Sequence, residues 1–194
     1  SLIETSDGGF ALLGYSDSVD GDVTTNNGNR DFWVVKIDAF GALTWQKSFG
    51  YTGADEGISI IETSDNHFIL SGVLDVTASG GEGNFGRFST RHAGGDYWSI
   101  KITQTGDVVW SRFYGGSFTD NPAGVLETAS NNLIIVGGSD SNDVDITNNK
   151  GSYDFWVVKS TATGDIVWEK SFGGSEIDEA RGIVSSGDGN HVIV

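Results

Sequence analysis

The sequence predicts an all-β protein made of β-propeller blades of four antiparallel strands, with about three and a half blades present. Two observations support this prediction: internal repeats of blade length, and abundant glycine with almost no proline. Glycine accounts for 29 of the 194 residues and proline for one. Glycine permits tight turns between short strands, whereas proline interrupts strand pairing. A four-stranded unit repeated at a near-fixed spacing is typical of propellers.

Three segments of the chain align with one another and define the repeats. They are DFWVVKIDAFGALTWQKSFG from Asp31, DYWSIKITQTGDVVWSRFYGG from Asp96 and DFWVVKSTATGDIVWEKSFGG from Asp154. We assign the repeats to 31–95, 96–153 and 154–194, after a hairpin at 1–14. Each repeat carries two tryptophans 12 residues apart, and we expect all six to pack in the core and between blades: Trp33 and Trp45, Trp98 and Trp110, Trp156 and Trp168.

Each repeat is predicted to contain four strands. The first, such as 32–37, is apolar on both faces, as in a strand packed between two layers. A turn containing Gly41, Gly106 or Gly164 leads to the second strand. The third and fourth strands form a hairpin, whose turns use residues that tolerate a positive φ: Gly8-Gly9, Asn66-His67, Asn131-Asn132 and Gly189-Asn190.

The two ends of the sequence carry the same half of a repeat. Residues 2–13 match 183–194, so the ends duplicate rather than complete each other. A closed ring usually needs four to eight blades. We therefore expect a segment of a longer propeller whose remaining blades belong to a parent chain. A ring assembled from further copies of this chain is the alternative.

The charge balance excludes several partners. With 11 Lys and Arg against 27 Asp and Glu, the formal net charge is −16, which argues against binding nucleic acid or an anionic membrane. No apolar run approaches the length of a membrane span, so we expect no membrane insertion. The absence of cysteine excludes disulfides and thiolate metal sites. An acidic surface rich in Asn, Ser, Thr and Gly suits an extracellular protein.

Two long connections, 16–31 and 139–154, match without a gap and suggest a calcium site. Both contain oxygen-bearing side chains at alternate positions, in the pattern D-x-D-x-T-x-N, and Ca²⁺ binds oxygen ligands. In the alternative interpretation these side chains cap backbone groups in Asx-type turns. The candidate ligands are Asp20, Asp22, Thr24 and Asn26, and Asp143, Asp145, Thr147 and Asn149.

The connection at 75–95 breaks the internal symmetry and is the candidate ligand-binding loop. It is longer than its counterparts and lacks the alternating oxygen pattern. Loops on a rigid scaffold often carry binding residues, and its aromatic and basic side chains could bind a sugar or a partner protein. A loop that only packs over its own blade is the alternative. The candidate binding residues are Phe85, Arg87, Phe88, Arg91 and His92.

No catalytic site is predicted, and we expect no enzyme activity. Asp31, Asp96 and Asp154 precede the aromatic-Trp pair in every repeat, which favours a structural role as hydrogen-bond acceptors. No hydrolase, zinc-protease or nucleotide-binding motif is present in the sequence. Apart from a possible Ca²⁺, we expect no cofactor.

The repeat motif resembles a known group of proteins. The string D-[FY]-W-x-[VI]-K, followed by G-x-[LIV]-x-W-x-[KR]-x-[FY]-G-G and by S-D-G-G-[FY]-[AI]-L-x-G, is similar to repeat-built β-propeller proteins that Bacteroidetes export through the type IX secretion system. The loop from Asp20 to Trp33 also matches that group. The resemblance covers almost the whole chain and implies a secreted or surface-displayed protein, for which adhesion or glycan binding is suspected.

A second similarity, to the blades of quinoprotein dehydrogenases, lies in K-x-D-x-x-G-x-x-x-W. The cofactor-binding residues of those enzymes have no visible match here, so we do not transfer that activity. The sequence therefore favours a noncatalytic secreted or cell-surface module that binds a glycan or a surface protein. The alternatives are a propeller enzyme acting on polysaccharide, a quinoprotein relative, and a structural spacer in a large adhesin.

Overall fold

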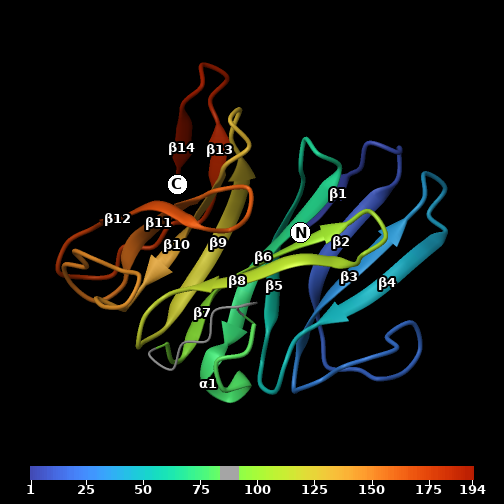
Figure 1. Cartoon of the computed structure of the whole chain (residues 1–194), viewed down its shortest axis with the longest axis horizontal. Helices are drawn as coiled ribbons and strands as arrows, with labels where there is room; N and C mark the ends of the chain where they lie inside the picture. The colour runs from blue at the N-terminus through green and yellow to red at the C-terminus, as the bar shows by residue number, and fades with distance from the viewer. Residues whose placement is uncertain (84–91) are drawn as a thin grey trace.

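The computed structural model of the chain describes residues 1–83 and 92–194. Within them, three four-stranded antiparallel sheets, which we term blades 1 to 3, are followed by a two-stranded hairpin (Figure 1). Blade 1 contains β1 (Leu2–Glu4), β2 (Phe10–Ser16), β3 (Asp31–Ile37) and β4 (Leu43–Phe49). Blade 2 contains β5 (Glu56–Glu62), β6 (His67–Asp75), β7 (Gly95–Thr103) and β8 (Val108–Tyr114). Blade 3 contains β9 (Asp120–Glu127), β10 (Leu133–Ser139), β11 (Asp154–Ser160) and β12 (Ile166–Phe172), and the hairpin contains β13 (Ile183–Ser185) and β14 (His191–Ile193).

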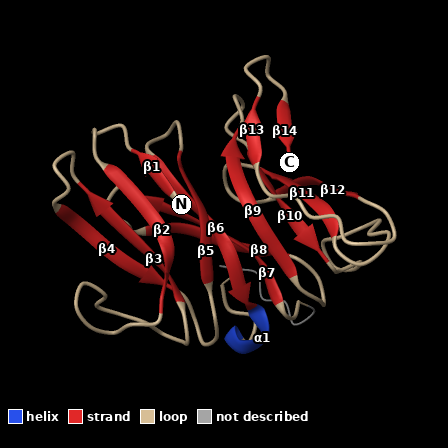
Figure 2. Cartoon of the chain, turned by 180° about the vertical axis from the view of Figure 1, so that it is seen from behind, coloured by secondary structure: helices blue, strands red, loops and turns tan. Residues whose placement is uncertain are grey.

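The blades stack side by side in chain order. Their first strands lie next to one another, because β1 contacts β5, β5 contacts β9, and β9 contacts β13. A short helix, α1 (Val76–Ser79), lies at the opposite end of the sheets from the β13–β14 turn (Figure 2). Within the described residues, no helix has the length and apolarity that crossing a membrane requires. The all-β prediction, with four-stranded antiparallel blades and an additional half blade, is confirmed.

The grouping of strands differs from the one expected from the sequence. The repeats 31–95, 96–153 and 154–194 were expected to form one sheet each, with the hairpin after the tryptophan strands. In the structure each hairpin instead pairs with the tryptophan strands that follow it, so that β6 pairs with β7 and β10 with β11. Self-comparison of a sequence reveals the period of a repeat but not its starting point, so the sheets are offset from these repeats by about half a unit.

The hairpin turns have the backbone geometry that their residues favour. The first residue of each predicted turn has a positive φ: 81° at Gly8, 58° at Asn66, 61° at Asn131 and 86° at Gly189. Asparagine tolerates this left-handed region better than most residues, and glycine adopts it without steric cost. These positions therefore fix where each hairpin reverses.

An aromatic contact recurs between neighbouring blades. Phe32 of blade 1 meets the ring of Trp98 of blade 2 edge-on, with 4.8 Å between the ring centroids. Tyr97 of blade 2 packs against Trp156 of blade 3 at 4.7 Å. Successive strand residues point to opposite faces of a sheet. In the pattern D-[FY]-W, the first ring therefore faces the following blade and the tryptophan faces the preceding one.

The second tryptophan of a blade bonds to the following blade. The indole Nε1 of Trp45 donates a hydrogen bond to the carbonyl oxygen of Gln104 at 3.0 Å, and Trp110 Nε1 donates to that of Ala162 at 2.9 Å. Both carbonyls lie in the turn between the third and fourth strands of the next blade. Each indole thus satisfies its polar atom while its ring is packed at the junction.

Paired aspartates meet a glycine where the chain passes from one blade to the next. At the junction of blades 2 and 3, a Cβ added to Gly115 would lie 2.5 Å from Asp120 Oδ2 and 2.7 Å from Asp96 Oδ1. The equivalent Gly50 and Gly173 lie against Asp31 and Asp154 in the same way. A side chain on this residue would displace a buried carboxylate, so the glycine is required by the close approach.

We predict that Gly115→Ala lowers the free energy of unfolding by about 1–3 kcal/mol, because the added methyl group overpacks the carboxylate pair. Urea unfolding of the purified variant measures this change. Gly14→Ala is the matched control, since an added Cβ at Gly14 meets no atom within 4 Å. Equal stability of the two variants would show that the close approach does not constrain the junction.

Candidate functional site

The connection that breaks the internal symmetry joins β6 to β7. It begins at Asp75, whose side chain caps α1 by accepting a hydrogen bond from the Ala78 N–H at 2.9 Å. Four of the five predicted binding residues, Phe85, Arg87, Phe88 and Arg91, lie outside the described residues. The fifth, His92, is described and lies in the junction between blades 2 and 3.

The His92 side chain is occupied by contacts inside the junction. It is only 9% exposed, and its Nδ1 lies 2.6 Å from Asp96 Oδ2. Its ring meets Phe113 edge-on at 4.9 Å, and its Nε2 lies 3.8 Å from Asp145 Oδ2. This burial places the imidazole among blade residues rather than at the surface, where a ligand would meet it.

His92 takes over a role that backbone groups perform in the other blades. Asp31 Oδ2 accepts a hydrogen bond from the Asn27 N–H, and Asp154 Oδ2 accepts one from the Lys150 N–H, both at 2.8 Å. Asp96 has the His92 imidazole in that place. The recurring aspartates are therefore hydrogen-bonded parts of the junctions, and the histidine is the local substitute for a backbone donor.

Burial shifts the ionisation of this cluster. It raises the pKa of Asp96 to about 6, although the bond to His92 acts in the opposite direction. Burial likewise raises the pKa of Asp120 to about 7, against hydrogen bonds from Ser139 and the Gly116 N–H. Burial alone would lower the pKa of His92, but the bond to Asp96 and the nearby carboxylates outweigh it, and the pKa rises.

In the connection between β10 and β11, the side chains of the D-x-D-x-T-x-N string bond to separate groups. Asp143 Oδ1 accepts a hydrogen bond from the Ser117 N–H at 2.9 Å, and Asp145 Oδ2 accepts one from the Gly115 N–H at 3.4 Å. Thr147 Oγ1 lies 3.2 Å from Asn148 Nδ2. The Asn149 amide donates to the Ser139 and Ser141 carbonyl oxygens, each at 3.0 Å.

The connection between β2 and β3 behaves similarly. Asp20 and Asp22 are exposed, Thr24 Oγ1 accepts from Gln46 Nε2 at 2.8 Å, and Asn26 Nδ2 donates to the Ser16 carbonyl at 3.1 Å. Among residues 1–83 and 92–194, no group of three or more His, Cys, Asp or Glu side chains is arranged to hold a metal ion. Calcium binding by these two strings stays a prediction.

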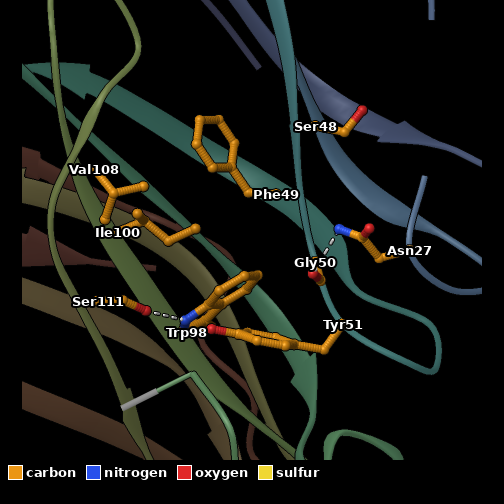
Figure 3. A pocket seen from close by; sticks show the side chains of 9 residues that line it. All are labelled: Asn27, Ser48, Phe49, Gly50, Tyr51, Trp98, Ile100, Val108 and Ser111. Carbon is orange, nitrogen blue, oxygen red and sulfur yellow. Dashed lines mark hydrogen bonds between the residues drawn. The ribbon is translucent and has the colours of Figure 1, made fainter. Parts of the chain in front are cut away.

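A pocket of about 200 Å³ lies between blades 1 and 2 (Figure 3). Three aromatic rings contribute to its wall, and the Tyr51 and Trp98 rings lie 5.8 Å apart. The Asn27 amide, which donates to the Gly50 carbonyl at 3.2 Å, adds a polar group. The lining residues are Asn27, Ser48, Phe49, Gly50, Tyr51, Trp98, Ile100, Val108 and Ser111.

The pocket departs from the internal symmetry. The position of Tyr51 is occupied by Gly116 and Gly174 in the following repeats. Trp98 Nε1 donates to Ser111 Oγ at 2.8 Å and to the Gly83 carbonyl at 3.3 Å, so the irregular connection reaches the tryptophan that lines the pocket. The pocket was not predicted from the sequence. The one signal for it was G-Y-T-G at 50–53, where the other repeats have G-G-S.

The chain shows distant similarity to known proteins. No family model matches the sequence. The regulatory protein FlaEY of Caulobacter vibrioides is 25% identical over 189 residues, which cover 92% of this chain and 20% of FlaEY. This chain thus spans about a fifth of that relative's length. A solved structure from Bacteroides caccae, of unknown function, matches 93% of this chain and 49% of its own, at 10% identity and a TM-score of 0.49.

We predict that the free energy of unfolding falls as the pH rises from 5 to 8. The raised pKa values of Asp96, about 6, and Asp120, about 7, mean that the folded state binds more protons than the unfolded state in this window. The stabilising contribution is complete below the ordinary aspartate pKa of 3.8 and is lost as the pH rises through the folded values. The raised pKa of His92 acts in the same direction.

Urea unfolding at pH 5 and pH 8 measures this dependence in the parent and in Asp120→Asn. The substitution removes one titrating group, so the difference between the two pH values should shrink. An unchanged difference in the variant would show that Asp120 does not contribute.

Proposed function

We propose that this chain is a noncatalytic binding module of a secreted or cell-surface protein, and that its ligand is a neutral glycan. The observation that carries the proposal is the aromatic-lined pocket of Phe49, Tyr51 and Trp98. It lies at the junction where the repeat pattern changes. Recurring features of a scaffold follow its internal symmetry, so a pocket that departs from it is the best candidate for a specific role.

The chemistry of the pocket suits a sugar ring. Tyrosine and tryptophan combine a broad apolar face with a polar atom, and a sugar likewise combines an apolar ring face with hydroxyl groups. The side-chain amide of the exposed Asn27 supplies an uncharged hydrogen-bonding group. At about 200 Å³ the pocket is smaller than typical sites for drug-sized molecules. It therefore fits one ring-sized group of a longer chain.

The charge of the protein supports a neutral ligand. The formal net charge is −16, and a strongly negative surface repels anionic partners. The side chains that line the pocket carry no formal charge. A neutral sugar avoids both the repulsion and the cost of burying a charge without a partner.

The architecture supports a display role. The three long connections join the second and third strands of successive blades, at 17–30, 76–94 and 140–153. Because the connected strands are equivalent, these connections leave the blades from the same end. Two of them have matching sequences and one differs. Binding residues are often located on loops that a rigid scaffold holds in place.

We expect the unsubstituted 194-residue chain to bind a subset of neutral oligosaccharides on a glycan array. The substitution Tyr51→Ala should weaken that binding at least tenfold. The substitution removes one aromatic wall of the pocket. Phe40→Ala is the matched control, because Phe40 is 96% exposed in a turn outside the pocket. Thermal unfolding of both variants shows whether the fold is retained.

Absence of binding by the unsubstituted chain would contradict the proposal and favour the alternative of a structural spacer. Binding that survives Tyr51→Ala unchanged would place the glycan site elsewhere. In that case the connection with Phe85, Arg87, Phe88 and Arg91 becomes the next candidate.

A further inference from the structure

The junctions between blades 1 and 2 and between blades 2 and 3 share one docking arrangement. In blades 1 and 2, the second tryptophan donates its indole N–H to a carbonyl in the turn between the third and fourth strands of the following blade. Trp45 donates to Gln104, and Trp110 donates to Ala162. At the second junction, the Tyr114 hydroxyl also donates to the Gly164 carbonyl at 2.9 Å. A turn between a third and a fourth strand therefore covers the second tryptophan of the blade before it.

The corresponding surface of blade 3 is open. Trp168 is 38% exposed, whereas the equivalent Trp110 is 7% exposed. Phe172 is 53% exposed, whereas the equivalent Tyr114 is 2% exposed. The next sheet is the two-stranded β13–β14 hairpin, which supplies equivalents of the first and second strands. Within the described residues, the Trp168 indole N–H has no hydrogen-bond acceptor.

A free strand edge lies beside this open surface. Strands β2, β6 and β10 each pair with two neighbours, whereas β14 pairs with β13 alone. Its second edge presents backbone N–H and C=O groups, which are a template for another strand. A groove of about 510 Å³ between blade 3 and the hairpin is lined by Trp168, by Lys159 and by His191 at the start of β14. The residues equivalent to His191, His67 in blade 2 and Leu133 in blade 3, each pair with the last residue before the covering turn.

We propose that β14, Trp168 and Phe172 bind a two-stranded polypeptide segment of the repeat type: an aromatic-Trp strand, a glycine turn and a second tryptophan strand. The segment adds to the edge of β14, and its turn covers Trp168. Continuity with the two existing junctions supports this occupant, because the same contacts would be made in the same order. The inference does not depend on the proposed glycan site.

The probe is a synthetic peptide with the sequence DFWVVKSTATGDIVWEKSFGG, which is residues 154–174 of this chain. It is added, without isotope label, to the full chain labelled with ¹⁵N. We expect a saturable shift of the Trp168 indole resonance and slower hydrogen exchange of the Ile193 amide. Gly182 and Val194 form a hydrogen-bonded pair of the hairpin, so the N–H of the adjacent Ile193 points away from β13, to the free edge. Trp168→Ala should weaken binding at least tenfold, whereas Phe40→Ala should not change it.

Three outcomes would overturn the proposal. The first is the absence of a saturable shift. The second is an equal response to a scrambled peptide, or shifts at the outer edges of β4 and β8, which would show unspecific strand addition. The third is association of the chain with itself, without peptide, that protects the Ile193 amide, because the occupant would then be a second copy.

Discussion

The contact between one aromatic ring and the tryptophan of the next blade is the interaction on which the architecture depends. The third strand of a blade carries large apolar residues on both faces, as in the buried β7, and a neighbouring blade is needed to cover each face. The adjacent residues of the D-[FY]-W motif solve this, because they point to opposite faces of one strand. Phe32 therefore reaches Trp98, and Tyr97 reaches Trp156, at nearly the same separation of 4.8 and 4.7 Å. Such ring pairs add about 0.5–1.5 kcal/mol each beyond the burial of their area.

The same junctions connect the scaffold to its candidate site. Buried aspartates at the start of the tryptophan strands hold the long connections in place through backbone N–H groups, or through His92 in blade 2. Where the chain crosses from blade 1 to blade 2, Tyr51 replaces a glycine of the other repeats, and its ring helps to form the pocket. The site thus arises from a small departure at a junction whose framework is otherwise unchanged.

Most of the strands and turns could be predicted from the sequence, because the internal repeats share the same spacing of tryptophans and glycines and because Asn66 and Asn131 mark turns. The pairing of strands into blades could not, since a period carries no starting point. The environment of His92 was also hidden: its bond to Asp96 depends on the loop returning to the start of β7. The pocket escaped prediction because Trp98 and Tyr51, 47 positions apart in the sequence, meet only when two blades stack.

A double-mutant cycle on Phe32 and Trp98 tests the stacking of blades most directly. The free energy of unfolding is measured for the parent, Phe32→Leu, Trp98→Phe and the double variant. The structure predicts a coupling energy of about 0.5–1.5 kcal/mol, because the two rings touch across the junction. Effects that add to within about 0.3 kcal/mol would mean that the rings do not interact, and would contradict the arrangement of the blades.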